Sequence, residues 1–186
     1  MEREMAQQTD EKITRLVQSG NIELFGILVE RYEKKMLRYG KKFLRSFEDI
    51  EDIVQEVFIK AYENIKSFDS KRKFSSWLYR IAHNEFINTI KKKSNNPLYL
   101  FDPDILFPHP VSKENSDKEI NREELNKIIN KYLDKLNLKY REPIILYYFE
   151  ELSYKEIADI LHIPIGTVAI RLKRGKEIMK KIYDQE

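Results

Sequence analysis

The sequence predicts an all-α protein. Only five of its 186 residues are glycine, and no segment shows the alternation of apolar and polar residues that marks a half-buried strand. Apolar residues recur instead at the three- and four-residue spacings of amphipathic helices. Hydrophobic residues make up 41% of the chain and charged residues 35%, so we expect a packed core beneath a highly charged surface.

Four helices are predicted before residue 94. The first begins at Thr9 or Asp10, and Asn21 is expected to cap the second, whose apolar side starts at Ile22. The third spans about 48–65 and the fourth about 74–93. The third has the clearest apolar stripe: Ile50, Ile53, Val54, Val57, Phe58, Ala61 and Ile65. In the fourth, the predicted inward residues are Leu78, Ile81, Ala82 and Ile90.

The composition changes after residue 93. Residues 94–118 contain four of the chain's six prolines, and no helical period continues through them. We therefore interpret 1–93 as one helical domain, 94–118 as a flexible linker and 119–186 as a second small helical domain. Pro143 falls within a helical pattern of the second domain, where it should start or kink its helix.

The second domain contains the pattern of a helix-turn-helix. Ser153 and Glu156 have the spacing of a capping box at the start of a short helix. That helix should end before Pro164, because the residue before a proline is disfavoured in the α conformation. A second helix starts near Gly166, and residues 171–181 carry six basic side chains and one acidic one. This arrangement suits docking in a DNA major groove; the plainer alternative is a helical hairpin with a solvated basic face.

Several classes of protein are excluded or disfavoured. The chain has no cysteine, which excludes disulfides, thiolate zinc sites and cysteine nucleophiles. Its three histidines are scattered, and there is no glycine-rich phosphate loop or nucleophile elbow, so we expect no enzyme activity, metal or cofactor. The N-terminus lacks the apolar core of a signal peptide and no segment is long enough to span a bilayer, which predicts a cytoplasmic chain without stable membrane insertion.

Acidic side chains gather on one face of the third predicted helix. Asp49, Asp52 and Glu56 are spaced i, i+3 and i+7, with Gln55 beside them. Carboxylates are favourable near a helix N-terminus, so a solvated helix start is one interpretation. A solvated helix start does not explain Glu56 well, because Glu56 lies two turns into the helix. A docking face for a basic protein partner explains all three carboxylates better. A metal site is a poor alternative, because no histidine lies nearby in the sequence.

Aromatic and basic residues are interleaved around the start of the fourth predicted helix. Single-stranded nucleic acid is bound in this way, since rings stack on exposed bases for about 1–3 kcal/mol each and cations hold the backbone. The candidate residues are Phe68, Lys71, Arg72, Lys73, Trp77, Tyr79, Arg80, Asn84 and Asn88. The formal net charge is only +3, so any such affinity must come from local patches of this kind. The plainer alternative places some of the rings, Phe74 among them, in the core.

These motifs together resemble those of a bacterial extracytoplasmic-function sigma factor, a group 4 member of the sigma-70 family. Residues 52–62 (DIVQEVFIKAY) resemble the family's core-polymerase-binding segment, and residues 74–84 (FSSWLYRIAHN) resemble its promoter-melting and −10-reading segment. Three further segments and two arginines resemble the family's −35-reading domain: residues 140–142, 148–158 and 166–168, with Arg171 and Arg174. The order and spacing of the motifs agree over nearly the whole chain.

The resemblance implies an alternative sigma factor with two helical domains, sigma regions 2 and 4, and no catalysis by the chain itself. Its partners would be core RNA polymerase, promoter DNA and an anti-sigma factor. Asp52, Gln55 and Glu56 would dock on the polymerase. Phe68 and Asn84 would bound a pocket for a flipped −10 base, while Trp77 and Tyr79 would support the melted strand. The duplex −35 element would be read by Thr167, Ala169, Ile170, Arg171, Lys173 and Arg174.

The chain departs from the family pattern in its recognition helix. Many members have a basic residue followed by Ser or Thr where this chain has Ala169 and Ile170. Apolar side chains there would favour a thymine methyl or leave more of the reading to DNA shape. The main alternative function, a stand-alone helix-turn-helix regulator, accounts for residues 139–181 but leaves the acidic helix and the aromatic segment unexplained.

Overall fold

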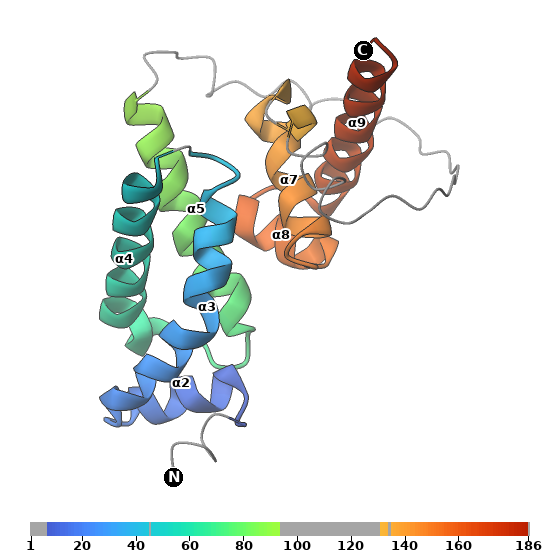
Figure 1. The fold of residues 1–186 in the computed structure, drawn as a ribbon. Helices are drawn as coiled ribbons and strands as arrows, with labels where there is room; N and C mark the ends of the chain where they lie inside the picture. The colour runs from blue at the N-terminus through green and yellow to red at the C-terminus, as the bar shows by residue number, and fades with distance from the viewer. Residues whose placement is uncertain (1–6, 45, 94–130, 134, 186) are drawn as a thin grey trace. The chain divides into compact units, whose positions relative to one another are not determined.

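The computed structural model describes residues 7–44, 46–93, 131–133 and 135–185 (Figure 1). All regular secondary structure in these ranges is helical, as predicted. The helices fall into two compact units, the first built from the helices up to Lys93 and the second from most of the chain that follows. The predicted linker at 94–118 lies outside the described residues, as does the start of the second predicted domain.

The N-terminal unit follows the predicted helix order closely. Its elements are α2 (Asp10–Gln18), the 3-10 turn η1 (Ile22–Leu24), α3 (Phe25–Gly40), α4 (Phe47–Asn64), the 3-10 turn η2 (Ile65–Ser67) and α5 (Phe74–Lys93). Hydroxyl caps fix two of the helix starts, because they satisfy amide groups that lack a partner within the helix. Thr9 Oγ1 accepts a hydrogen bond from Lys12 N at 3.3 Å, and Ser46 Oγ accepts one from Asp49 N at 3.2 Å.

The second predicted helix differs at its start. Residues 22–24 form the turn η1, and α3 begins only at Phe25. Asn21 makes no side-chain cap there; its Nδ2 donates to Leu16 O at 3.3 Å and so satisfies a carbonyl in the last turn of α2. Ile22 is therefore not part of the apolar side, and 57% of its surface is exposed.

The core of the N-terminal unit lies between α3, α4 and α5. All seven residues of the predicted α4 stripe are buried, because they follow the helical period without interruption. On α5, Leu78 and Ala82 are buried as predicted, whereas Ile81 and Ile90 are only half-buried. Phe86, which was not among the predicted inward residues, is fully buried and packs edge-on against Tyr39 at a ring-centroid distance of 5.7 Å.

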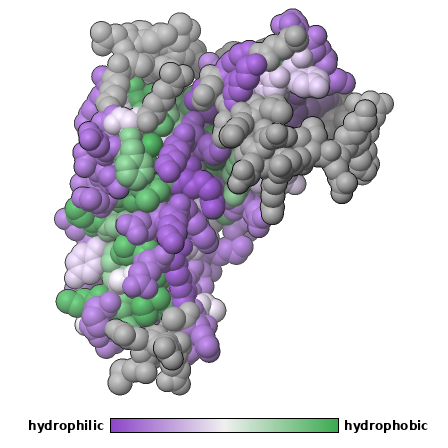
Figure 2. Space-filling view, in the orientation of Figure 1, coloured by the Kyte–Doolittle hydropathy of each residue, from purple (hydrophilic) through white to green (hydrophobic). Residues whose placement is uncertain are grey.

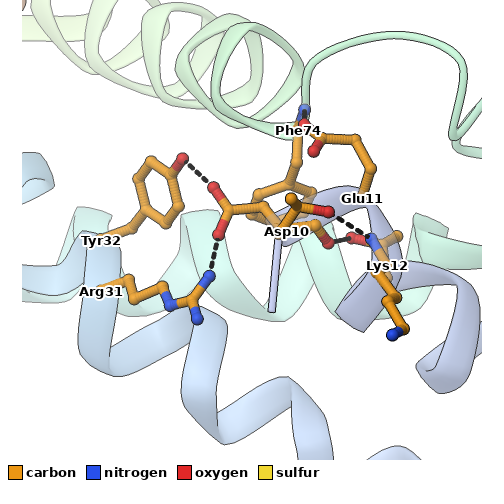
Figure 3. A network of polar contacts seen from close by, with 8 residues as sticks. Asp10, Glu11, Lys12, Arg31, Tyr32 and Phe74 are labelled. Carbon is orange, nitrogen blue, oxygen red and sulfur yellow. Dashed lines mark hydrogen bonds and ion pairs between the residues drawn. The ribbon is translucent and has the colours of Figure 1, made fainter. Parts of the chain in front are cut away.

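A polar network joins α2 to the neighbouring helices (Figure 3). The Asp10 carboxylate accepts hydrogen bonds from the Arg31 guanidinium and the Tyr32 hydroxyl, both on α3. Burial, together with the hydrogen bond to Asp10, raises the pKa of the Tyr32 hydroxyl above its usual value. Glu11 follows Asp10 on α2, and its Oε1 accepts a hydrogen bond at 3.1 Å from the backbone N of Phe74, the first residue of α5. These bonds fix α2 against both α3 and α5.

The C-terminal unit contains α7 (Leu138–Tyr148), α8 (Tyr154–Leu161) and α9 (Ile165–Asp184). Asn137 caps α7, with Oδ1 accepting a hydrogen bond from Lys139 N at 3.1 Å. Pro143 lies inside α7, so it does not start this helix, and the predicted kink stays a prediction. Fully buried apolar residues come from all three helices and include Ile145, Ile157 and Val168.

The predicted helix-turn-helix is present in α8 and α9. Ser153 Oγ accepts a hydrogen bond from Glu156 N at 3.4 Å, and Glu156 Oε2 accepts one from Ser153 N at 2.8 Å, which completes the predicted capping box. Helix α8 ends where His162 adopts the left-handed conformation, with φ of 54°. Pro164 then occupies the N-cap position of α9, so the second helix starts one residue earlier than predicted.

Gly40, at the end of α3, generates a prediction about the N-terminal core. A Cβ atom at this position would lie 2.6 Å from Ile50 Cγ2 on α4 and 2.6 Å from Phe86 Cζ on α5. Gly40→Ala should therefore lower the free energy of unfolding by about 1–3 kcal/mol, the usual effect of an extra methyl group in a packed core. Urea denaturation followed by circular dichroism measures this change.

Gly26 provides a matched control on the same helix. A Cβ atom there would meet none of the described atoms within 4 Å. Gly26→Ala should leave the unfolding free energy unchanged or raise it by up to about 1 kcal/mol, since alanine is the better helix former. Equal destabilisation by the two substitutions would contradict a steric requirement at Gly40.

Candidate polymerase and nucleic-acid interfaces

The predicted acidic face lies on the outer side of α4. Asp52, Gln55 and Glu56 are exposed, while the buried stripe of the same helix faces the core. Asp49 is half-buried, and its amide group donates to the Ser46 cap. The helix therefore presents two carboxylates and an amide together to solvent, as the helical spacing predicted.

Exposed apolar side chains continue this face along α4. Ile59 is 51% exposed and Tyr62 is 41% exposed, and they follow Asp52 and Gln55 by seven residues. The Tyr62 ring contacts Phe25 of α3 at a centroid distance of 5.3 Å. Hydrophobic residues are visible on this side of the N-terminal unit, over α4 and its border with α3 (Figure 2). Apolar residues beside charged ones are typical of protein-docking surfaces.

The sequence contains a signal for Ile59 and Tyr62 that lies outside the apolar stripe of their helix. Both are large apolar residues on a helix whose core stripe was already complete without them. An apolar residue that falls outside such a stripe is a candidate for the surface, and several on one face are a signal for a contact surface.

A pocket of about 330 Å³ opens between α4 and α5. Its lining is mainly polar, with one aromatic wall, and consists of Lys60, Asn64, Ser67, Trp77, Arg80, Ile81, Asn84 and Glu85. An amide side chain such as that of Asn84 can both donate and accept hydrogen bonds, and an indole ring offers a face for stacking. The predicted residues Trp77, Arg80 and Asn84 are therefore brought together in one concave site.

An ion pair fixes one side of this pocket. Lys60 Nζ lies 2.7 Å from Glu85 Oε2, and the same ammonium group lies 3.3 Å from Glu56 Oε1. The hydrogen bond to Glu85, more than the one to Glu56, raises the pKa of Lys60. Lys60 thus connects a carboxylate of the acidic face with a carboxylate of the pocket wall. Sequence analysis missed Lys60 and Glu85, because their pairing depends on how α4 packs against α5.

Two of the predicted −10 aromatic residues, Phe68 for the pocket and Tyr79 for the melted strand, are buried and do not line the pocket. Phe68 is only 5% exposed, and its ring lies behind the pocket wall, 5.1 Å from the Trp77 ring centroid. Tyr79 is 2% exposed and packs edge-on against Tyr39 in the core. Tyr79 is buried because it lies three and seven positions before the buried residues Ala82 and Phe86. This spacing places it on the core side of α5. Phe74 is fully buried, as the plainer alternative expected.

The polar candidates of the N-terminal unit remain accessible. Lys71, Arg72 and Lys73 are exposed in the turn before α5. Asp69 stabilises this turn, since its Oδ1 accepts a hydrogen bond from Lys71 N at 3.0 Å. On α5 the exposed candidates recur every four residues and so share one helix face: Arg80, Asn84 and Asn88.

The candidate recognition helix α9 has both buried and partly exposed candidates. Thr167 and Arg171 are buried, with 7% and 8% of their surface exposed, and burial lowers the pKa of the Arg171 guanidinium. The half-buried candidates are Ala169, Ile170, Lys173 and Arg174. Direct contact of Arg171 with DNA would require it to become exposed, so its predicted role remains a prediction, and Arg174 presents the more accessible guanidinium.

The described part of the chain contains neither a candidate metal site nor a helix that could span a membrane. Within it, no cluster of three or more His, Asp or Glu side chains has an arrangement that could hold a metal ion. Its helices are also too short or too polar for any of them to cross a membrane.

Comparison with known proteins gives family matches in both parts of the chain. Residues 28–96 match the family description Sigma-70 region 2, and residues 126–179 match Sigma-70, region 4. The ECF RNA polymerase sigma factor SigW of Bacillus subtilis is 40% identical over 89% of this chain and 91% of its own length. The ECF RNA polymerase sigma-E factor of Haemophilus influenzae is 34% identical over 95% of this chain and 96% of its own length.

A solved structure shows the same fold. It is the sigma factor RpoE from Bartonella quintana in complex with the anti-sigma factor NepR, with a TM-score of 0.64 and 24% identity over 86% of this chain and 96% of that one. The chain therefore belongs to the sigma-70 family of RNA polymerase sigma factors, within its extracytoplasmic-function group.

Proposed function

We propose that this chain is an alternative sigma factor that binds core RNA polymerase and directs it to a particular set of promoters. The observation that carries the proposal is the placement of the acidic face and the Asn84 pocket on the same pair of helices, α4 and α5. A polymerase contact and a promoter contact on one small rigid unit would set the DNA at a defined position on the enzyme. The names of similar sigma factors support this function.

In this proposal the two units read different forms of DNA. The N-terminal unit holds the −10 element as a melted strand, with one base extruded into the pocket and the backbone held by Lys71, Arg72 and Lys73. The C-terminal unit reads the −35 element as duplex through α9. The chain supplies binding energy to the polymerase and carries out no catalysis itself, and its place of action is the cytoplasm, with the polymerase. An anti-sigma factor is the further partner that the family implies.

A stand-alone helix-turn-helix regulator is the alternative. It would use α8 and α9 but would need neither the acidic face nor the pocket between α4 and α5. Co-purification of the tagged chain with core RNA polymerase distinguishes the two functions. Selection of promoter DNA with the reconstituted holoenzyme would then define the sequences at −35 and −10, and a chain that binds DNA without polymerase would contradict the proposal.

The acidic face should be the polymerase anchor. Asp52→Lys combined with Glu56→Lys sets like charges against a basic partner and should weaken binding to core polymerase by more than about tenfold, since like-charge contacts across an interface are opposed by several kcal/mol. Competition with the wild-type chain for core polymerase measures this effect. The control is Glu30→Lys with Glu33→Lys, which makes the same charge change at exposed positions on α3. If both double variants compete equally well, α4 is not the anchor.

Asn84 should determine preference at a single −10 position. Asn84→Ala removes an amide that can donate to and accept from an extruded base, so discrimination at that position should fall by about 1–3 kcal/mol while −35 recognition is retained. Promoter variants at each −10 position, bound by holoenzyme, test this. Asn88→Ala, one turn further along the exposed face of α5 and outside the pocket, is the comparison, and it should leave the base preference at that position unchanged. A uniform loss at every position would instead indicate a folding defect.

On α9, Arg171 and Arg174 should matter more for the −35 element than the distal lysines. Alanine at either arginine should reduce −35-dependent binding by about 1–3 kcal/mol if it removes a bidentate guanine contact. If the arginine instead contacts a phosphate, its loss should reduce the slope of log affinity against log salt concentration by about one unit. The comparison is with Lys180→Ala and Lys181→Ala together, both exposed near the end of the helix. Binding of −35 DNA by holoenzyme, measured against salt concentration for each variant, tests this prediction. A larger effect of the lysine pair would overturn the assignment of the two arginines to −35 recognition.

A further inference from the structure

One helix holds both ends of the basic loop in the N-terminal unit. The loop, residues 69–73, connects η2 to α5 and carries Lys71, Arg72 and Lys73. Helix α2 is about fifty residues earlier in the sequence, yet it packs against both η2 and α5. Two of its side chains reach the backbone on either side of the loop.

Gln18 fixes the loop entry. Its Nε2 donates to Ile65 O at 2.7 Å and to Phe68 O at 2.8 Å, so both amide hydrogens are directed at the backbone that leads into the loop. Phe68 N also donates to Ile65 O at 3.1 Å, which closes the η2 turn. The two hydrogen bonds from Gln18 are partly buried. Losing them would cost free energy, because water cannot fully replace the donor at a partly buried carbonyl.

Glu11 fixes the loop exit. It precedes Gln18 by seven residues and therefore lies on the same face of α2. Its Oε1 accepts a hydrogen bond from the amide of Phe74, the first residue of α5, at 3.1 Å. The first amides of a helix have no partner within the helix, and a carboxylate is favourable at this end because of the helix dipole. The rings of Phe68 and Phe74 also contact each other, with centroids 5.8 Å apart, so the two ends of the loop lie close together.

Helix α2 is itself anchored by separate bonds. Asp10 binds Arg31 and Tyr32 of α3, next to Glu11 but directed away from the loop (Figure 3). The helix therefore does not depend on the loop for its position. A five-residue segment whose ends are both tied to one fixed helix has few conformations to lose when it binds a ligand.

We propose that Glu11 and Gln18 are positioning residues for promoter recognition: they hold the basic loop in the conformation that receives the melted −10 strand. This inference rests on the proposed function, in which the loop and the adjacent pocket bind that strand. Neither residue contacts DNA in the proposal. Each acts through the backbone at one end of the loop.

The test uses near-isosteric variants that remove only the hydrogen-bonding group. Gln18→Met removes both donors, and Glu11→Met removes the acceptor, whereas Glu11→Gln retains an oxygen for Phe74 N. Gln7→Met and Glu30→Met are the controls, since both residues are exposed outside this contact. Three properties are measured: hydrogen exchange of residues 68–74 in the full chain, stability to urea, and holoenzyme binding to fork DNA with an unpaired −10 strand and to duplex −35 DNA.

We expect Gln18→Met and Glu11→Met to speed exchange in the loop and to weaken binding of fork DNA, each by about threefold to tenfold, the loss expected for one or two hydrogen bonds. Binding to core polymerase and to duplex −35 DNA should be unchanged. Glu11→Gln and both controls should behave like wild type. This pattern separates positioning from general stability, because a stability defect would lower all binding activities of the chain together.

Unchanged loop exchange in both variants would overturn the proposal, as would faster exchange with undiminished fork-DNA binding. Failure of the proposed function has a different signature. If the wild-type holoenzyme binds no fork DNA, the −10 assignment is wrong, and the exchange measurements alone show whether α2 holds the loop.

Discussion

The N-terminal unit depends on the close approach of three helices at Gly40. With no side chain at this position, the end of α3 can touch Ile50 of α4 and Phe86 of α5 directly. The pocket and the Lys60–Glu85 ion pair lie between the same two helices, α4 and α5, that meet at Gly40. A position without a side chain thus belongs to the packing of the two helices that form a polar site.

Helix α4 contributes to two sites at once. Its outer face carries Asp52 and Glu56, and its side toward α5 carries Lys60 and Asn64 of the pocket. Lys60 touches a carboxylate belonging to each site. A partner that engages Glu56 would therefore change the charge next to the pocket wall, which gives polymerase binding a direct physical route to the proposed DNA site.

Local patterns in the sequence were enough to predict the helices of the N-terminal unit and the cap of α8, but not the start of α3, which Asn21 does not cap. The α4 stripe and the Ser153–Glu156 capping box were both predicted correctly, because each depends on residues within a few positions of one another. The site was only partly predictable. Helical spacing places Tyr79 on the core side of α5, but only tertiary packing decides that Trp77 and not Phe68 faces the pocket. The contacts of Gln18 with Ile65 and Phe68 likewise join segments that no local pattern connects.

The wall of the pocket also contains the chain's only tryptophan, Trp77. Indole emission responds to the polarity of its surroundings and is quenched when a nucleobase stacks against the ring. Every other aromatic residue of the chain is Tyr or Phe, so excitation at the red edge of the absorption band selects this one side chain. The natural sequence therefore carries its own spectroscopic reporter at the proposed −10 site, and strand capture can be followed in real time without a label.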